Sequence, residues 1–116
     1  LGARMAVLAP PALLTPRHSL PMGGVLEHRL AELTALVEET AAVSRACGAP
    51  ADPVRALTLY DAFPARAKSS MQRDAEAGRP LELDAIGGSL LRAAERHGVS
   101  VPVTARVVAE LRAAGH

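Results

Sequence analysis

The stretch GVLEHRLAELTALVEETAAVSRACG, residues 24–48, decides the fold class. Apolar or small residues recur in it every three or four positions, while charged residues such as Glu27, Glu38 and Arg45 fall between them. This period matches a helical turn, so we predict one long helix that buries one face and ends at Gly48. Its expected inward positions are Leu26, Leu30, Leu33, Val37, Ala41 and Ser44.

The rest of the chain also reads as helices. Asp52 followed by Pro53 is a typical helix start, because aspartate accepts hydrogen bonds from the first turn and proline has no N–H to leave unpaired there. Gly78 and Gly98 are typical helix ends, and no segment alternates apolar and polar residues over the length of a strand. We therefore predict an all-α, bundle-like single domain of five or six helices over residues 1–116. After the first long helix, the others are expected near residues 53–63, 64–78, 84–97 and 102–111.

Composition excludes several classes of function. The 13 basic and 12 acidic residues give a net charge of +1 and are spread along the chain, so we expect no nucleic-acid partner. No segment approaches the roughly 18 uninterrupted apolar residues of a membrane span. Cys47 is the only cysteine and the histidines lack metal-ligand spacing, so we expect no disulfide within the chain and no metal site. A cytoplasmic protein fits this pattern best.

The glycine pairs do not form a nucleotide-binding turn. Gly23–Gly24 and Gly87–Gly88 both lack the G-x-G-x-x-G spacing that, after a strand, brings backbone amides to a pyrophosphate. We therefore expect this chain to bind no dinucleotide cofactor by itself.

The candidate site residues lie in and beside SSMQRDAEAGRPLELDAIGG, residues 69–88. Glu82 stands between two leucines where a loop should enter the next helix, and two adjacent hydroxyls, of Ser69 and Ser70, lie on the predicted helix before it. This pattern predicts that Ser70 and Glu82 face a common cavity. Lys68, the only lysine of the chain, lies beside Ser70 in sequence and is counted with the candidate substrate-binding residues.

Each of these residues also has a structural interpretation. Glu82 suits a loop carboxylate that is stabilised by the positive end of the next helix or by Arg79. Ser70 suits a helix-surface hydroxyl, and Lys68 suits a solvated helix residue. Asp84 is expected to cap the next helix, and Arg79 to be an ion-pair partner within the loop.

From Ser69 onward the sequence resembles the C-terminal helical domain of the ketopantoate reductase (2-dehydropantoate 2-reductase) family. The family pattern reads approximately S-M-x-x-D-x-x-x-G-R-x-x-E-x-D-x-x-x-G, followed by a helix and G-x-x-x-P. Its positions are held here by Ser70, Met71, Asp74, Gly78, Arg79, Glu82, Asp84, Gly88, Gly98 and Pro102. The resemblance implies a helical fold like the C-terminal domain of 6-phosphogluconate dehydrogenase. It also implies a role in the NADPH-dependent reduction of a 2-oxo acid, with NADPH held by a separate domain.

The resemblance implies that Ser70 and Glu82 contact a hydroxy-acid substrate, and we expect Glu82 to be the catalytic group. The lysine that donates a proton in the family is replaced by Arg4, which cannot give up a proton near neutral pH but can bind a carboxylate. Two asparagines of the family site are replaced by Leu8 and Ala12, so the expected cleft is more apolar.

Two prolines add to these departures from the family pattern. Pro10 and Pro11 lie between the positions of the two lost asparagines, and we expect them to break the helix there. A third asparagine of the family site, just before the serine pair, is replaced by Ala67.

Two classes of function remain open, beside a degenerate interaction module. In the first, the chain is the substrate-binding and dimerising part of an oxidoreductase, incomplete without a separate NADPH-binding domain or protein. In the second, it is a free-standing enzyme that binds a small molecule and performs cofactor-free acid–base chemistry through Glu82, as an isomerase or a cyclase does. Both predict a small-molecule ligand, and the first also predicts a homodimer.

Overall fold

A computed structural model describes residues 2–116, and in this part of the chain every regular element is a helix. The predicted all-α class is therefore confirmed. The elements are α1 (Ala3–His18), α2 (Met22–His28), α3 (Leu30–Ala46), α4 (Pro53–Asp61), α5 (Ser70–Glu76), the π-helical turn η1 (Asp84–Gly88), α6 (Ser89–His97) and α7 (Pro102–Ala113).

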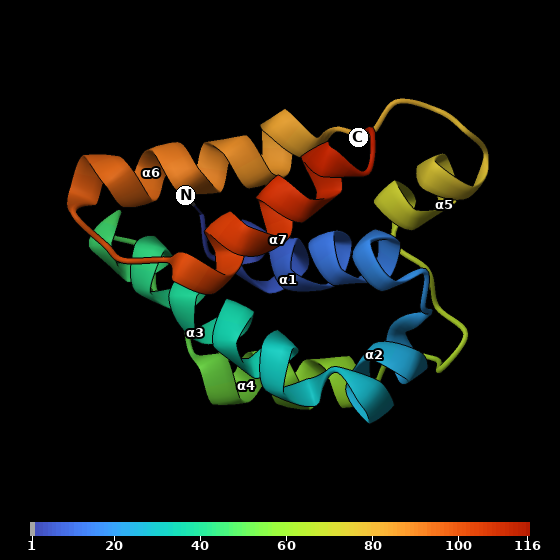
Figure 1. The fold of residues 1–116 in the computed structure, drawn as a ribbon. Helices are drawn as coiled ribbons and strands as arrows, with labels where there is room; N and C mark the ends of the chain where they lie inside the picture. The colour runs from blue at the N-terminus through green and yellow to red at the C-terminus, as the bar shows by residue number, and fades with distance from the viewer. Residues whose placement is uncertain (1) are drawn as a thin grey trace.

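Helix α1 is the centre of the fold. Figure 1 shows it between α6 and α7 on one side and α3 and α4 on the other, and it contacts α2, α3, α5 and α7. Leucines from three of these helices meet in the core with almost no exposed surface: Leu13 and Leu14 of α1, Leu33 and Leu36 of α3, and Leu111 of α7. Burial of such side chains supplies the main driving force for folding.

The prolines of α1 do not break the helix, so this prediction was wrong. The helix is continuous from Ala3 to His18 although proline lacks the N–H that the carbonyl four residues earlier accepts in a regular helix. For Pro11 that carbonyl belongs to Val7, and the hydroxyl of Tyr60 donates to it instead. Tyr60 is fully buried, and this burial raises the pKa of its phenol, so the hydroxyl stays protonated as a donor.

The long helix predicted over residues 24–48 is two helices, α2 and α3, with a break at Arg29. Arg29 has φ −132° and ψ 28°, outside the helical region. The change of direction moves Leu30 away from the core, and its side chain is 50% exposed, so its predicted inward position was wrong. Beyond the break the predicted positions are buried as expected: Leu33, Val37, Ala41 and Ser44.

Helix ends agree with the sequence where local chemistry sets them. Asp52 caps α4 as predicted, and its carboxylate accepts from the N–H groups of Val54 and Arg55 at 3.0 and 3.4 Å. Gly78 and Gly98 have φ of +70° and +66°, the left-handed conformation that glycine adopts without strain.

Two other helix starts differ from the prediction. Helix α5 begins at Ser70 rather than near residue 64, because the Ser69 hydroxyl accepts from the Gln72 N–H at 3.0 Å and sets the N-cap there. Asp84 makes no capping hydrogen bond, so its predicted role as an N-cap was wrong. Its carboxylate instead accepts from the guanidinium of Arg92 at 3.0 Å.

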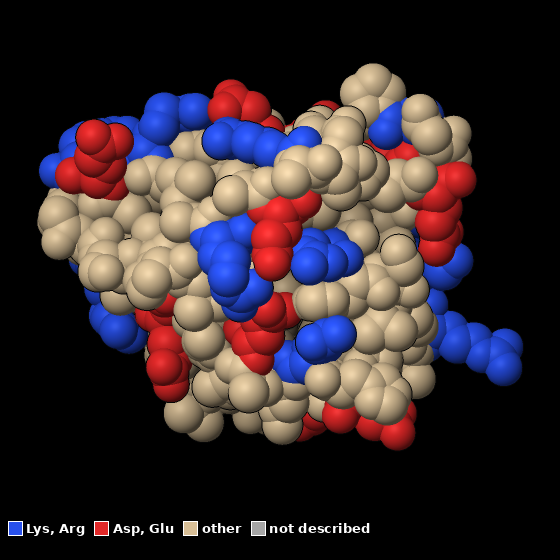
Figure 2. Space-filling model, in the orientation of Figure 1, with Lys and Arg blue, Asp and Glu red and all other residues tan. Residues whose placement is uncertain are grey.

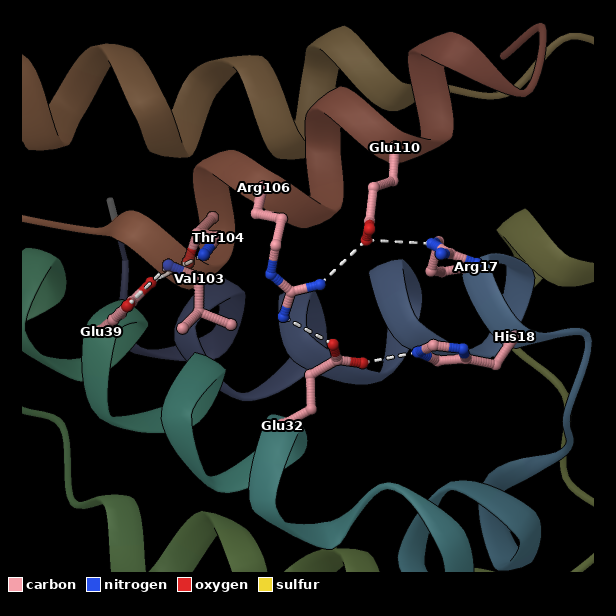
Figure 3. Close-up of polar contacts among 8 residues, drawn as sticks. All are labelled: Arg17, His18, Glu32, Glu39, Val103, Thr104, Arg106 and Glu110. Atoms are coloured by element: carbon pink, nitrogen blue, oxygen red, sulfur yellow. Dashed lines mark hydrogen bonds and ion pairs between the residues drawn. The ribbon is translucent and has the colours of Figure 1, made fainter.

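Charged side chains connect three helices at one surface (Figure 3). The Glu32 carboxylate of α3 lies 2.5 Å from the His18 ring of α1 and 2.7 Å from the Arg106 guanidinium of α7. Burial raises the pKa of Glu32, but the hydrogen bonds and charges of Arg106 and His18 outweigh it, so the pKa lies below its ordinary value. Glu110 bridges Arg106 and Arg17 at 3.0 and 3.1 Å.

The surface gives few further indications. Figure 2 shows acidic and basic side chains interspersed over the face drawn, without a broad area of one sign. Within residues 2–116, no helix combines the length and the hydropathy needed to cross a membrane.

Candidate functional site

A pocket of about 290 Å³ lies between α1, the segment before α5, and the turn η1. Its apolar lining includes Met5, Leu8 and Ala12 of α1 together with Phe63 and Ile86. Its polar lining consists of Thr15, Lys68, Ser69 and Ser70. A mostly apolar pocket with a few convergent polar groups is the usual form of a small-molecule site.

The segment that carries Lys68 and Ser69 is held against the start of α2. The N–H groups of Met22 and Gly23 donate to the carbonyls of Ala67 and Ala65, both at 2.8 Å. A Cβ at Gly23 would lie 2.7 Å from the Ala65 Cβ and 2.9 Å from its backbone, so only glycine permits this approach. Gly23 was not among the predicted site residues. Its place in a glycine pair was the sequence feature that could have indicated a close backbone approach.

Two hydroxyls of the pocket are already paired with the protein. The Thr15 hydroxyl donates to the Pro11 carbonyl at 2.8 Å, and it lies 2.6 Å from the Ser69 hydroxyl. Since Thr15 uses its proton on Pro11, Ser69 must be the donor between the two hydroxyls. Ser69 also accepts from the Gln72 N–H, so neither hydroxyl has a proton left for a ligand.

Ser70 and Lys68 are the polar side chains that remain for a ligand. Among the described residues the Ser70 hydroxyl has no hydrogen-bond partner, and the side chain is exposed at the pocket. The Lys68 ammonium donates to both carboxylate oxygens of Glu76 at 3.0 and 2.9 Å. Both side chains of this pair are more than 40% exposed, so solvent screens it and a ligand anion can compete with Glu76.

Arg4 and Glu82 are exposed and are not part of the pocket lining. Each lies one helical turn from a residue of the pocket lining. Arg4 precedes the lining residue Leu8 by four positions on α1, and the Glu82 carbonyl accepts from the N–H of the lining residue Ile86 at 3.1 Å. The pocket lining therefore includes Ser70 and Lys68 but neither Arg4 nor Glu82.

The two leucines beside Glu82 serve the core. Leu83 is 3% exposed and Leu81 is half-buried, and Glu82 itself faces solvent. Arg79 forms an ion pair, as predicted, but its partner is Asp74 of α5 at 2.9 Å and not Glu82.

A second pocket, of about 400 Å³, lies between α1, α3 and α4. Alanine, valine and proline side chains form most of its lining, and its charged residues are Asp52 and Arg55. The Asp52 carboxylate is engaged in capping α4, and none of the sequence-predicted site residues lines this pocket. The smaller pocket is therefore the candidate site.

Comparisons with known proteins agree with the fold. The family model described as "Ketopantoate reductase PanE/ApbA C terminal" matches residues 5–115. A 2-dehydropantoate 2-reductase of Caulobacter vibrioides is 39% identical over 85 residues, which are 71% of this chain and 29% of that protein. The uncharacterized oxidoreductase YkpB of Bacillus subtilis is 33% identical over 110 residues, which are 90% of this chain and 36% of that protein.

Solved structures show the same arrangement of helices. The crystal structure of 2-dehydropantoate 2-reductase from Methylococcus capsulatus matches with a TM-score of 0.86 and 26% identity, over 95% of this chain and 40% of that chain. The chain spans about a third of the length of the curated relatives it matches.

Proposed function

Because the chain belongs to the ketopantoate reductase family and forms its C-terminal helical domain, we propose that it binds the substrate of an oxidoreductase that reduces a 2-oxo acid. The observation that carries this proposal is the pocket beside α1, where Lys68 and Ser70 are the available polar side chains. An ammonium group and a hydroxyl are suited to bind the carboxylate and the oxygen beside it. The relatives from Caulobacter vibrioides and Methylococcus capsulatus are named 2-dehydropantoate 2-reductases, which makes 2-dehydropantoate the first substrate to test.

In this proposal Arg4 and Glu82 act from the rim of the pocket. Arg4 adds positive charge on the same face of α1 as Leu8 and attracts an anionic substrate. Glu82 is the only acidic candidate, and it serves as the proton carrier. Solvent access to Glu82 allows it to exchange protons with water.

The described residues do not fit a dinucleotide. Residues 2–116 form no strand, so they contain no strand, glycine-rich turn and helix in succession. NADPH would therefore have to be held by a separate domain or protein, which supplies the hydride. We further propose that the chain contributes to a homodimer, and sedimentation velocity of the purified chain tests this directly.

The comparisons do not favour a cofactor-free isomerase or cyclase, since the matched relatives are named as reductases and as an oxidoreductase.

Binding of 2-dehydropantoate to the purified chain, followed by isothermal titration calorimetry, tests the proposal. We expect saturable binding that Ser70→Ala weakens about tenfold, because one hydrogen bond to a charged ligand is lost. Ser100→Ala, an exposed serine outside the pocket, is the matched control and should leave binding unchanged. Equal weakening by both variants, or no binding by a folded chain, would overturn the proposal.

A titration with NADPH alone separates the two binding functions. We expect no saturable change in NADPH fluorescence on addition of the chain. Saturation in the micromolar range would contradict the assignment of NADPH to a separate domain.

A further inference from the structure

The lining of the pocket beside α1 is apolar apart from four polar residues, of which Lys68 and Ser70 are available to a ligand. Met5, Leu8 and Ala12 follow one another at three- and four-residue steps, which places them on one face of α1. Ile86 of η1 adds a further apolar side chain, as does Phe63. None of these five side chains offers a hydrogen-bond donor, and the Met5 thioether is their only, weak, acceptor.

Leu8 and Phe63 leave an unusual amount of apolar surface uncovered in this pocket. Leu8 is 46% exposed and Phe63 is 39% exposed, so both are among the large apolar side chains that face solvent. Both belong to the same small pocket rather than to scattered positions. Contiguous exposed apolar surface of this kind is typical of a ligand-binding site, because an apolar ligand group removes it from water.

The polar groups of the pocket can satisfy one end of a ligand only. The Thr15 hydroxyl donates its proton to the Pro11 carbonyl, and the Ser69 hydroxyl donates its proton to Thr15. The Ser70 hydroxyl and the remaining N–H of the Lys68 ammonium both belong to the lining, and the two residues are two positions apart in sequence. A carboxylate can bind these two groups, but a hydroxyl at the far end of the ligand would lie among apolar side chains without a partner.

From this distribution we infer that the pocket selects a 2-oxo acid with an unhydroxylated, branched aliphatic or aromatic side chain. The carboxylate lies at Lys68 and Ser70, and the side chain lies against Leu8, Phe63 and Ile86. A volume of about 290 Å³ is near the lower end for small-molecule pockets, which suits a small acid of this class. The inference rests on the proposed function, since it specifies the substrate of the same pocket.

Two ligands that differ in one group test the inference. The first is 2-dehydropantoate, and the second is its isostere in which a methyl group replaces the side-chain hydroxyl. Isothermal titration calorimetry of the whole chain is expected to show about tenfold tighter binding of the methyl isostere, because the hydroxyl of 2-dehydropantoate is buried unpaired. Lys68→Met is expected to weaken both ligands by a similar factor, because it removes the shared carboxylate partner.

Leu8→Asn is the decisive variant. It places an amide, which can hydrogen-bond a ligand hydroxyl, in the apolar part of the pocket. The chain should then bind the isostere and 2-dehydropantoate with about equal affinity, or bind 2-dehydropantoate more tightly. Thermal melting of each variant checks that the chain still folds, and Leu8→Met, which keeps the apolar lining, is the matched control and should retain the preference.

The outcomes separate the two proposals. Equal or tighter binding of 2-dehydropantoate by the unmodified chain overturns the inference and leaves the proposed function standing. If Leu8→Asn leaves the preference for the methyl isostere unchanged, the inference is also overturned, since the apolar lining would then not be the cause of that preference. If the folded chain binds neither acid, the proposed function fails, and the inference fails with it.

Discussion

The hydroxyl of Tyr60 donates a hydrogen bond to the main-chain carbonyl of Val7, whose usual helical donor is missing because residue 11 is proline. This contact joins α4 to the central helix α1 at the point where sequence rules place a break. Tyr60 is also in edge-to-face contact with Phe63, whose ring lines the candidate pocket. The same side chain therefore supports the continuous helix and one wall of the site.

Replacing Tyr60 by phenylalanine tests this contact. We expect the free energy of unfolding in urea to fall by about 1–3 kcal/mol, because the Val7 carbonyl loses its donor while the ring is kept. Pro11→Ala restores the helical N–H to the Val7 carbonyl. Tyr60→Phe should therefore lower the free energy of unfolding less in the Pro11→Ala background than in the unmodified chain. Equal losses in the two backgrounds would show that Tyr60 does not compensate for the proline.

Glu39 of α3 caps the first turn of α7 from outside the helix. Its carboxylate accepts from the N–H groups of Val103 and Thr104 at 3.0 and 2.8 Å and from the Thr104 hydroxyl at 2.7 Å (Figure 3). Glu39→Ala should cost about 1–2 kcal/mol of stability, as loss of an N-cap does. The neighbouring exposed residue supplies the control: Glu38→Ala should change the urea midpoint little. Similar losses for both variants would contradict the capping role.

The lowered pKa of Glu32 makes stability depend on pH. Since this pKa is lower in the folded chain than the ordinary value of about 4.3, the ionised carboxylate stabilises the fold above that pH. The stabilisation should be lost as the pH falls through the folded pKa. We expect the difference in unfolding free energy between the unmodified chain and Glu32→Gln to be large at pH 7 and to shrink as the pH falls below the ordinary pKa of a glutamate. A difference that stays constant over this fall in pH would speak against the charged contacts with His18 and Arg106.

Gly23 should matter for the pocket as well as for the fold. In Gly23→Ala the new methyl group meets the backbone of Ala65, so the segment carrying Lys68 and Ser69 must move. We expect a loss of about 1–3 kcal/mol in stability and weaker binding of the 2-oxo acid ligand. Gly24→Ala is the matched control, because its methyl group meets only the side chain of Leu20, at 3.1 Å. If both variants bind the ligand equally well, the close approach at Gly23 does not position the pocket.

Glu82→Gln separates a functional carboxylate from a structural one. Glu82 is exposed, so the substitution should leave the melting temperature unchanged while weakening ligand binding about tenfold. Glu95→Gln, an exposed glutamate on α6, is the matched control. A lower melting temperature with binding intact would assign Glu82 to the structure, and its role at the site would be abandoned.

Sequence by itself determined the features that depend on chemistry within a few residues. The helical period, the Asp52 cap and the left-handed glycines 78 and 98 are local, because a helix turn and its ends involve neighbours along the chain. An ion pair of Arg79 was also predicted, but its partner, Asp74, was not. The fixed spacing from Ser70 to Pro102 was enough to identify the family, which the family model then confirmed over residues 5–115.

Only the tertiary structure decided the features that join distant segments. Tyr60 keeps α1 continuous through Pro11, and Glu39 caps α7. Gly23 has no side chain and so allows the close approach of Ala65, in the segment before α5. Each of these contacts pairs residues more than 40 positions apart, where no local pattern reports on their partners. The pocket follows the same rule, because burial among α1, the segment before α5, and η1 places Phe63 and Ile86 beside Leu8 and leaves Glu82 outside the lining. Side-chain packing between helices, rather than the propensity of any one helix, therefore sets the shape and polarity of the candidate site.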